Sequence, residues 1–462
     1  MCARWRRSCS SRLRKTALNM CRYRRPEAGA PVAGAREVEV LVVGAGPAGL
    51  AAACVAAEAG KKVAVLDNSP WLGGQIWRGE QARPKQATAQ RWLARLKQSG
   101  AQVFNQATAF AAPSPSRLLA ETQGDVLEFT WQKIILATGA REMFVPFPGW
   151  TLPGVLGPGG LHAMSKAGWP VAGKRVVVAG TGPLLLAVAD GLKQHGAQVR
   201  LVAEQTPLTK VLRFGLGLWR FPSKLVQGAG VKSRLLGVPY RCGCWPVKAE
   251  GAGRVERVTL TDGAGTWCED CDWLACGFHL VPNVELPLLL GCELSAGSVR
   301  VSELQETTVA NVFCAGEPTG IGGAECALAE GQIAGLAAAG LVAQARALLP
   351  KAAAWHRFRD ALNGAFSLRP ELRAVAKPDT IVCRCEDVSR AAMESAADWR
   401  AAKLHTRCGM GACQGRTCGA AAQFLFGWEN SSVRLPVFPV KVGALVAAET
   451  TDNNTASTQT KT

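Results

Sequence analysis

The sequence contains no hydrophobic run long enough to span a bilayer, and this absence predicts a protein without a transmembrane segment. Its most apolar later stretch, residues 331–349, is interrupted by Gln332, Gln344 and Arg346 and is dominated by alanine and glycine rather than leucine and isoleucine. We expect this stretch to pack inside the protein.

Acidic residues are missing from the start of the chain. Nine basic residues precede the first acid, Glu27, and carry half of the formal net charge of +18. The segment lacks the apolar core and cleavage site of a secretory signal. We expect residues 1–36 to be a disordered basic extension or the product of a start codon placed too early, with Met20 as another candidate start; a transit peptide is a weaker alternative. No basic groove interleaved with aromatic residues follows, so nucleic-acid binding is disfavoured.

Seventeen cysteines occur in this chain without a recognisable secretory signal. The combination favours a reducing compartment, in which thiols bind metal or lie buried, over a framework of disulfides. We therefore expect a cytoplasmic protein that associates with membranes, if at all, through its partners.

Length and composition predict two or three α/β domains. At 462 residues the chain exceeds a single ordinary core, and its 50 glycines and 48% hydrophobic residues suit units with tight strand-to-helix turns.

A first nucleotide-binding unit is predicted where the β-rich residues 38–43 end in a glycine turn before an alanine-rich helix over residues 50–59. The turn contains Gly44, Ala45, Gly46, Pro47, Ala48 and Gly49. Its first glycine permits the sharp turn, the second lets a pyrophosphate approach the backbone, and the third lets helix and strand pack closely. A second strand, residues 62–66, ends at Asp67, which can accept hydrogen bonds from a ribose. The order of these elements predicts that the unit binds FAD or another adenine nucleotide.

A second unit of the same kind begins with a predicted strand over residues 174–179. Its turn contains Gly180, Thr181, Gly182 and Pro183. A helix through Gln194 and a strand over residues 198–202 follow. Leu185 stands where the third glycine would be, and the only nearby acid, Glu204, is either a ribose ligand or a solvated surface residue. The unit therefore binds NAD(P) or is an empty structural domain, and the sequence leaves both open.

Two further segments add to the pattern of strands and glycine turns. Residues 131–136 and 309–315 are predicted strands, and each is followed by a glycine-rich sequence. The residues that follow are Thr138, Gly139, Ala140 and Arg141 in the first case and Gly316, Glu317, Gly320, Gly322 and Gly323 in the second. With the two glycine turns, this pattern resembles the two-dinucleotide-binding-domain flavoproteins of the pyridine nucleotide–disulfide oxidoreductase type over residues 38–349. The resemblance implies that both segments cover an FAD and that the acid binds its ribityl chain. Glu317 replaces the usual aspartate, which keeps the charge and changes the reach.

The catalytic disulfide of that superfamily is missing. No cysteine occurs in residues 71–78 or 151–173, where related disulfide reductases place their pairs. Disulfide exchange at the flavin is therefore disfavoured, and the electrons must leave by another route.

A cysteine cluster near the C-terminus is the candidate route. Its members are Cys383, Cys385, Cys408, Cys413 and Cys418. Four thiolates can hold a [2Fe-2S] cluster or a zinc ion, and the number of ligands does not choose between them. The nearby arginines favour an iron–sulfur cluster only slightly, and the nearby glycines allow backbone amides to approach the sulfurs. These residues are Arg384, Arg407, Arg416, Gly409, Gly411 and Gly415.

Residues 379–428 are similar to the small two-iron domain of bacterioferritin-associated ferredoxin, with a wider second pair of cysteines. The resemblance implies that the ligands are Cys383, Cys385, Cys413 and Cys418. Cys408 is then the spare thiol, or it replaces Cys413 in a shifted interpretation.

The other cysteines are expected to have structural roles. A second metal site is disfavoured for four of them, because they lie in segments predicted to form strands and hairpins. These four are Cys242, Cys244, Cys268 and Cys271. The cysteines expected to pack in the core are Cys54, Cys276, Cys292, Cys314 and Cys326.

The combination of segments is similar to one group within the superfamily. The matching segments are residues 73–77, which begin with Gly73, Gly74 and Gln75, residues 148–155, residues 275–283 and the cysteine domain. The group comprises the alpha (A) subunits of opine oxidases, D-hydroxyproline and L-proline dehydrogenases and hydrogen cyanide synthase, which are related to the alpha subunit of heterotetrameric sarcosine oxidase.

This resemblance implies an electron-transfer subunit that receives electrons from an amine-oxidising flavoprotein beta subunit. A small ferredoxin-like subunit is a further candidate partner. The substrate would be the CH–NH group of an amino acid or opine. A stand-alone NAD(P)H-dependent reductase and a non-catalytic nucleotide-binding scaffold are the alternatives.

No nucleophile–base pair can be picked out, so the catalytic residues are unknown. His162 and His279 are expected to be structural, and Lys166 is expected to be solvated rather than close to a flavin.

The predicted fold is α/β, with two doubly wound Rossmann-like units and a small helical iron–sulfur domain. The predicted segments are 1–36 (extension), 37–165 with 300–349 (FAD-type domain), 170–299 (NAD(P)-type domain), 350–378 (linker), 379–430 (iron–sulfur domain) and 431–462 (C-terminal segment with a disordered tail).

Overall fold

The computed structural model describes residues 33–429 and 433–448. The expected basic extension therefore lies almost entirely outside the described residues, as does the expected C-terminal tail. Within the described parts, every helix is too short or too polar to cross a bilayer.

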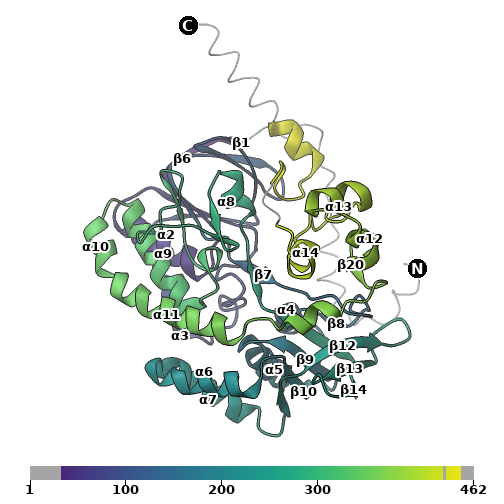
Figure 1. Ribbon diagram of the computed structural model, residues 1–462. Coiled ribbons are helices and arrows are strands. Elements are labelled where there is room, and N and C mark those ends of the chain that lie inside the picture. The colour runs from purple at the N-terminus through teal and green to yellow at the C-terminus, as the bar shows by residue number, and fades with distance from the viewer. Residues whose placement is uncertain (1–32, 430–432, 449–462) are drawn as a thin grey trace, which may run out of the picture.

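The first domain is built on a seven-stranded sheet with the order β3-β2-β1-β6-β5-β4, in which β19 also pairs with β6. Two of its strands, β1 and β6, are labelled in Figure 1. Its strands are β1 (Ala33–Val43), β2 (Val63–Asp67), β3 (Gln102–Asn105), β4 (Thr108–Ser114), β5 (Arg117–Glu121), β6 (Val126–Leu136) and β19 (Val312–Cys314). The pairs from β3 through β1 and β6 to β19 are parallel, and β4, β5 and β6 form an antiparallel meander. All five residues of β2 are buried, as expected for a parallel strand covered on both faces.

Helix α9 packs directly on helix α2 beside this sheet. The helices of this region are α2 (Pro47–Glu58), α3 (Ala87–Gln98), α9 (Ala324–Ala338) and α10 (Val342–Ala347). A Cβ atom added to Gly331 would lie 2.1 Å from the carbonyl oxygen of Ala48, and one added to Gly335 would lie 2.4 Å from that of Ala52. The small residues in the first half of the stretch 331–349 are needed because two helix backbones meet there, and most of α9 is buried. The second half does not pack inside as expected, because only Ala345 of α10 is buried.

The second domain has a five-stranded parallel sheet with the order β11-β10-β9-β15-β8. Its strands are β8 (Val155–Leu156), β9 (Arg175–Thr181), β10 (Gln198–Glu204), β11 (Tyr240–Cys242) and β15 (Trp273–Phe278). A separate antiparallel sheet contains β12 (Trp245–Glu250), β13 (Arg257–Thr261) and β14 (Thr266–Asp270). The helical elements are α4 (Pro158–Lys166), α5 (Leu184–Gln194), α6 (Leu208–Gly217), η2 (Leu218–Arg220) and α7 (Pro222–Arg234).

The chain crosses between the two domains through β7 (Ala140–Glu142) and β16 (Leu280–Pro282), which pair antiparallel. The crossing points differ from the expected boundaries at residues 165 and 299. Strand β8 joins the second sheet, whereas residues 284–299 pack on the core of the first domain. This latter segment contains α8 (Glu285–Leu289), β17 (Leu294–Ser295) and β18 (Ser298–Val299). Strand pairing decides these domain boundaries. No change in amino-acid composition marks them along the sequence.

Residues 350–378, expected as a linker, contain a long packed helix. The elements here are α11 (Leu349–Ala365) and η4 (Pro370–Ala374). The short helix η3 (Glu317–Thr319) lies earlier in the chain and precedes α9. The ring of Phe366, just after α11, meets that of Phe214 on α6 edge-on at 5.2 Å between centroids. The segment therefore ties the two domains together.

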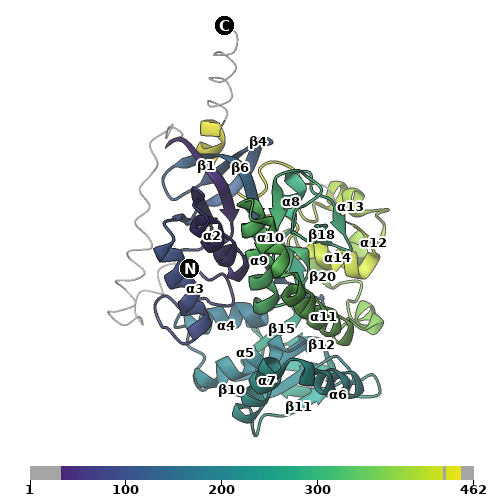
Figure 2. The ribbon, with the colours of Figure 1, turned by 90° about the vertical axis from the view of Figure 1, so that its left-hand side faces the viewer.

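The cysteine-rich domain follows as a small unit on the flank of the molecule (Figures 1 and 2). It contains β20 (Ile381–Cys383), β21 (Val388–Ser389), α12 (Arg390–Glu394), α13 (Trp399–Thr406) and α14 (Cys418–Phe426). The Ser389 and Asp398 side chains cap α12 and α13 by accepting hydrogen bonds from the amides of Ala392 and Ala401. Beyond it, the Val437 amide donates to the carbonyl oxygen of Phe110 on β4, so the C-terminal segment returns to the first domain.

Candidate functional site

Two of the three glycines in the first glycine turn lie where a side chain would clash with a neighbouring backbone. A Cβ on Gly44 would lie 2.2 Å from the carbonyl oxygen of Ala137, and one on Gly49 would lie 1.8 Å from that of Gly44. A Cβ on Gly46 would instead meet only the Cα atom of Gly74, at 4.0 Å. A Cβ on Gly74 would in turn lie 3.0 Å from the Cα atom of Gly46, so these two backbones lie close together. No side chain covers the N-terminus of α2 at Gly46, which fits a pyrophosphate bound there.

Asp67 ends β2 and supports this turn from behind. Its two carboxylate oxygens accept hydrogen bonds from the amides of Ala45 (2.6 Å) and Ser69 (2.7 Å). Burial raises the pKa of the Asp67 carboxyl, against these hydrogen bonds. Each carboxylate oxygen has a second lone pair, so a ribose hydroxyl remains a compatible partner.

Glu317 carries a buried oxygen without a partner. Its Oε1 accepts a hydrogen bond from the amide of Gly323 at 2.9 Å, whereas its Oε2 has no hydrogen-bond partner among the described residues. Burial raises the pKa of Glu317 to about 7. A buried orphan acceptor indicates a missing donor, and a hydroxyl of a bound ligand would supply one. The unpaired acceptor at this end of α9 therefore fits a hydroxyl-bearing ligand such as a flavin nucleotide.

The segment Thr138–Gly139–Ala140 is held by one asparagine across the domain crossing. Thr138 Oγ1 donates to the carbonyl oxygen of Asn283 (2.6 Å), and Asn283 Nδ2 donates to that of Thr138 (2.8 Å). The backbone amide of Asn283 donates to the carbonyl oxygen of Gly139 (3.0 Å). This exchange fixes the loop that the superfamily resemblance places over the flavin.

The second glycine turn is closed by a carboxylate. Glu204 Oε2 accepts from the amide of Gly182 at 2.7 Å, and its Oε1 accepts from Thr181 Oγ1 (2.8 Å) and the Thr206 amide (2.9 Å). Glu204 ends β10 and is fully buried, so the alternative of a solvated surface acid is wrong. Burial raises its pKa in spite of these donors.

Residues 366–369 lie across the same turn. The carbonyl oxygen of Ser367 accepts from Gln205 Nε2 at 3.1 Å. The carbonyl oxygen of Phe366 lies 3.4 Å from Thr181 Oγ1, whose single proton makes the shorter hydrogen bond to Glu204. The Arg369 amide donates back to Gln205 Oε1 at 3.2 Å. In an open α/β sheet, ligands bind beyond the carboxyl ends of the strands, and here the chain itself occupies that position at β9 and β10.

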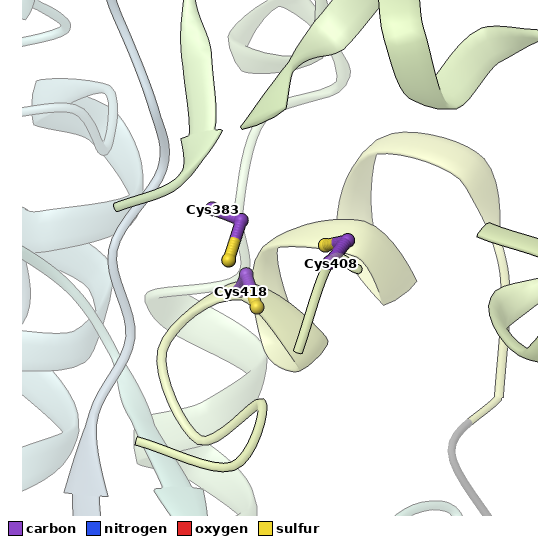
Figure 3. Close-up of side chains that lie close together, drawn as sticks. All are labelled: Cys383, Cys408 and Cys418. Carbon is purple, nitrogen blue, oxygen red and sulfur yellow. The ribbon is translucent and has the colours of Figure 1, made fainter. Parts of the chain in front are cut away.

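Three of the five clustered cysteines meet in the core of the small domain. The sulfurs of Cys383, Cys408 and Cys418 all lie within 4.8 Å of one another. Figure 3 shows them beside the start of α14, with the Cys408 sulfur directed toward the other two. Cys408, expected as the spare thiol, is therefore part of the group.

The remaining two cysteines extend this group toward the surface. Cys413 lies within hydrogen-bonding reach of both Cys418 and Cys385, and Cys385 is exposed. The five sulfurs thus run from exposed Cys385 to Cys408, whose Sγ lies 3.6 Å from Met393 Sδ in the domain core.

Backbone amides point at these sulfurs, as the glycines suggested. Hydrogen bonds from the thiols of Cys408 and Cys418 lower the pKa of Cys383, with further contributions from the amides of Gly409 and Glu386. Gly409 cannot carry a side chain, because its Cβ would lie 2.6 Å from the Trp399 ring. Free thiols ringed by amides are a donor set that fits an iron–sulfur cluster.

A direct contact joins strand β7, which follows Thr138 and Gly139, to the segment between Cys413 and Cys418, here called the cysteine loop. Arg141 Nε donates to the carbonyl oxygen of Arg416 at 3.0 Å, and Arg416 lies between Cys413 and Cys418. The Arg141 guanidinium also pairs with Glu285 at 2.9 Å, and Glu285 lies 4.0 Å from the Arg416 guanidinium. The 275 residues between the two arginines explain why sequence reasoning missed this contact: no local signal links them.

A second contact fixes the small domain at its other side. The indole nitrogen of Trp150 donates to the carbonyl oxygen of Ile381 at 2.6 Å. Arg373 Nε donates to that of Phe424 at 3.0 Å. The cysteine domain is therefore docked rather than tethered.

The other cysteines lie as expected, with one addition. All fourteen cysteines of the described residues are free thiols, and the five expected in the core are buried. Cys242, Cys244, Cys268 and Cys271 do not come together as a metal-binding group within the described residues. Cys326 does lie within 4.8 Å of Glu330 and His356.

The group of Cys326, Glu330 and His356 has a structural role, which follows from the hydrogen bonds of Glu330. Glu330 is buried, and its carboxylate accepts from the Gly316 amide (2.8 Å), Thr319 Oγ1 (3.0 Å) and His356 Nε2 (2.8 Å). The Arg359 guanidinium lies 3.6 Å away, which disfavours a cation. Glu330 thus holds the Gly316 turn, a role that the sequence did not reveal.

The two histidines and the lysine differ in their surroundings. Burial lowers the pKa of His162 to about 4, and its Nε2 packs on Gly191 of α5. His279 Nδ1 lies 3.1 Å from the carbonyl oxygen of Leu280. Lys166 is partly buried, and this burial lowers its pKa, so it is less solvated than expected.

Comparison with known proteins assigns the family. A model of the family described as pyridine nucleotide-disulphide oxidoreductase matches residues 38–331. The chain belongs to this family. It is therefore an oxidoreductase with a flavin- or nucleotide-binding domain.

Similar proteins match along most of the chain. Hydrogen cyanide synthase subunit HcnB of Pseudomonas protegens is 32% identical over 82% of this chain and 89% of its own. The A subunit of opine oxidase from Rhizobium meliloti strain 1021 is 31% identical over 88% of this chain and 97% of its own. The crystal structure of L-proline dehydrogenase from P. horikoshii has the same fold, with a TM-score of 0.62, 20% identity and coverage of 89% of this chain and 80% of that one.

Proposed function

We propose that this chain is the electron-transfer subunit of a multi-subunit dehydrogenase or oxidase that acts on the CH–NH group of an amino acid or opine. The observation that carries the proposal is the junction between Arg141 and Arg416, which joins strand β7 of the nucleotide-binding part to the cysteine loop. The names of the similar proteins, which are subunits of hydrogen cyanide synthase and opine oxidase, support it.

The first unit would hold FAD. The backbone of Gly46, which has no side chain, would face the pyrophosphate, Asp67 would accept from the ribose, and the unpaired Oε2 of Glu317 would accept from the ribityl chain. FAD supplies a carrier that accepts two electrons and releases them singly. The full set of residues proposed to bind it is Gly44, Gly46, Pro47, Ala48, Gly49, Asp67, Gly73, Gly74, Gln75, Thr138, Gly139, Ala140, Gly316, Glu317, Gly322 and Gly323.

The cysteine domain would hold a [2Fe-2S] cluster on Cys383, Cys385, Cys413 and Cys418. These four sulfurs are consecutive neighbours, whereas Cys408 lies at the core end against Met393. Cys408 is the alternative ligand in place of Cys413, because it shares the buried group with Cys383 and Cys418.

The second unit would be structural rather than a site for NAD(P). The amide of Gly182, which would face a pyrophosphate, already donates to Glu204, and residues 366–369 cover the turn. Gly180, Gly182 and Pro183 then serve the fold only. This argues against the stand-alone NAD(P)H-dependent reductase.

Electrons would therefore enter from a partner. We expect an amine-oxidising flavoprotein subunit to co-purify with the chain, and a small ferredoxin-like subunit is a further candidate. Purification of the tagged chain from its native host, followed by identification of the proteins that travel with it, tests this point. A chain that is recovered alone and oxidises an amine by itself contradicts it.

The central experiment is anaerobic purification followed by iron, acid-labile sulfide, zinc and flavin analysis of one sample. We expect two irons and two sulfides for each flavin, and a reduced-cluster signal by electron paramagnetic resonance after photoreduction. Zinc without sulfide, or a colourless nucleotide without flavin, would contradict the proposed role in electron transfer. Rapid bleaching of the flavin by NADH would show that the second unit is open.

Two matched substitutions identify the ligands. We expect Cys413→Ser to lose the cluster absorbance and the iron, and Cys408→Ser to keep both. The reverse result would exchange the roles of these thiols.

A further inference from the structure

Helices α6 and α7 and the turn η2 between them form a hairpin with an exposed apolar stripe. Neither helix contains a fully buried residue. The stripe consists of Leu208, Leu212, Leu216 and Trp219, whose exposed fractions are 55%, 56%, 77% and 68%. The leucines are spaced one helical turn apart, so they lie along one side of α6. Large apolar side chains gathered on one exposed face mark an interaction surface.

The opposite side of α6 already does the packing. Val211, Phe214 and Leu218 are partly buried, and the ring of Phe214 contacts those of Phe358 and Phe366. The exposed stripe is therefore not needed to hold the hairpin on the protein.

The hairpin is positively charged throughout. No aspartate or glutamate occurs between Glu204 and Glu250. Lys224 and Arg234 pair with Glu325 and Asp190 of neighbouring elements. Lys210 and Arg213 form no ion pair with a described residue and lie on the same helix as the leucines. The Arg220 guanidinium also has no acidic partner among the described residues and lies over the Trp219 ring, 5.3 Å from its centroid. Unpaired cations thus flank the apolar stripe.

The hairpin also lies at an edge of the molecule. In Figures 1 and 2, α6 and α7 are at the bottom of the view, away from the cysteine domain and from the first sheet. An edge position lets a flat surface approach without meeting the rest of the chain.

We propose that this hairpin docks on an anionic lipid surface, with Leu212, Leu216 and Trp219 entering the boundary between headgroups and acyl chains. A helix with a leucine and tryptophan face flanked by unpaired cations has the composition of an interfacial helix. Anionic headgroups complement Lys210, Arg213 and Arg220, and each cation near such a surface strengthens binding. The chain would then sit on a membrane without crossing it.

The test is co-sedimentation of the full-length holoprotein with vesicles. One set contains phosphatidylglycerol and phosphatidylcholine in equal parts, and the other contains phosphatidylcholine alone. We expect binding to the first set, weak binding to the second, and loss of binding at high salt.

Two double variants separate the hairpin from the rest of the chain. Leu212→Glu with Leu216→Glu should weaken binding on the order of 100-fold, because two leucines no longer enter the apolar layer. Leu404→Glu with Val342→Glu, which are 70% and 41% exposed on other helices, changes the charge equally and should bind as the parent does. Lys210→Ala should weaken binding roughly 5-fold.

The basic residues before Glu27 attract the same vesicles, so the comparison uses the full chain in every case. Unchanged visible absorbance shows that a variant is folded. Equal binding of the two double variants would overturn the proposal. So would loss of a co-purifying subunit from the hairpin variant with lipid binding intact, since the stripe would then be a protein interface.

Discussion

The two glycine turns begin alike and end differently. Both connect a buried parallel strand to a helix, and in both the first glycine meets a neighbouring backbone, Ala137 for Gly44 and Gly277 for Gly180. In the first unit the space over Gly46 is open and Glu317 offers an unpaired oxygen. In the second, Glu204 and residues 366–369 use the donors that a ligand would need.

The comparison teaches that the motif specifies a turn and not its occupant. Asp67 and Glu204 both end the second strand of their unit and both accept amides of their own glycine turn. The difference comes from what covers the turn, and for the second unit the cover comes from the chain about 185 residues later.

The largest expected effect comes from the first glycine of the open unit. Gly44→Ala should lower the free energy of unfolding by about 3–5 kcal/mol and abolish flavin retention, because Gly44 has a φ of 103° and a Cβ there overlaps Ala137. Urea unfolding and flavin analysis measure both. Gly60→Ala is the control, since Gly60 has a φ of 81° but open space, and we expect a loss of about 1 kcal/mol. Equal losses would contradict the close approach.

The next effect is a pH dependence that belongs to the open unit. The pKa of Glu317 is raised to about 7 from an ordinary value of 4.5, so its contribution to stability is fully present below pH 4.5 and is lost as the pH rises through 7. The loss should amount to about 3 kcal/mol in the flavin-free chain. Thermal unfolding across this range should show that Glu317→Gln flattens the dependence. A hydroxyl donor from bound flavin should flatten it too, and an unchanged slope in the variant would argue against a buried carboxyl.

The third effect concerns the contact of the open unit with the cysteine domain. Arg141→Ala removes the hydrogen bond to Arg416 and leaves Glu285 without its closest cation, which should cost about 2 kcal/mol and slow electron transfer from flavin to cluster. Rapid-reaction absorbance after flavin reduction measures that rate.

Arg373→Ala is its control, because Arg373 also donates to a carbonyl oxygen of the cysteine domain, that of Phe424. We expect this variant to lose stability without a slower transfer. If both variants slow the transfer alike, domain docking rather than the Arg141 junction controls it.

The smallest effect separates the two units most cleanly. Gly46→Ala should leave stability within about 0.5 kcal/mol, because Gly46 has a φ of −73° and no close neighbour, yet it should weaken flavin binding about 10-fold by filling the pyrophosphate space. Gly182→Ala should cost about 1 kcal/mol for its φ of 91° and leave flavin binding unchanged. Flavin titration of both variants is the measurement, and a flavin effect at Gly182 would refute the closed second unit.

Much of the fold could be predicted from local sequence patterns. The strands that end at Asp67 and Glu204, the two glycine turns and the cysteine domain follow from runs of β-branched residues, glycine spacing and clustered thiols. Domain boundaries could not, because β8 belongs to the second sheet through its pairing with β15 and not through any change in composition. Cys408 was harder still: its distance from Cys383 depends on how α12 and α13 fold between them.

By itself, the sequence determined which segments are strands and turns and which residue types are present to bind a nucleotide and a metal, since these depend on neighbours along the chain. Only the tertiary structure decided which turn stays open and which arginine reaches the cysteine loop. Such contacts join residues that are roughly 100 to 300 positions apart, and they depend on how packed layers align rather than on local conformational preference.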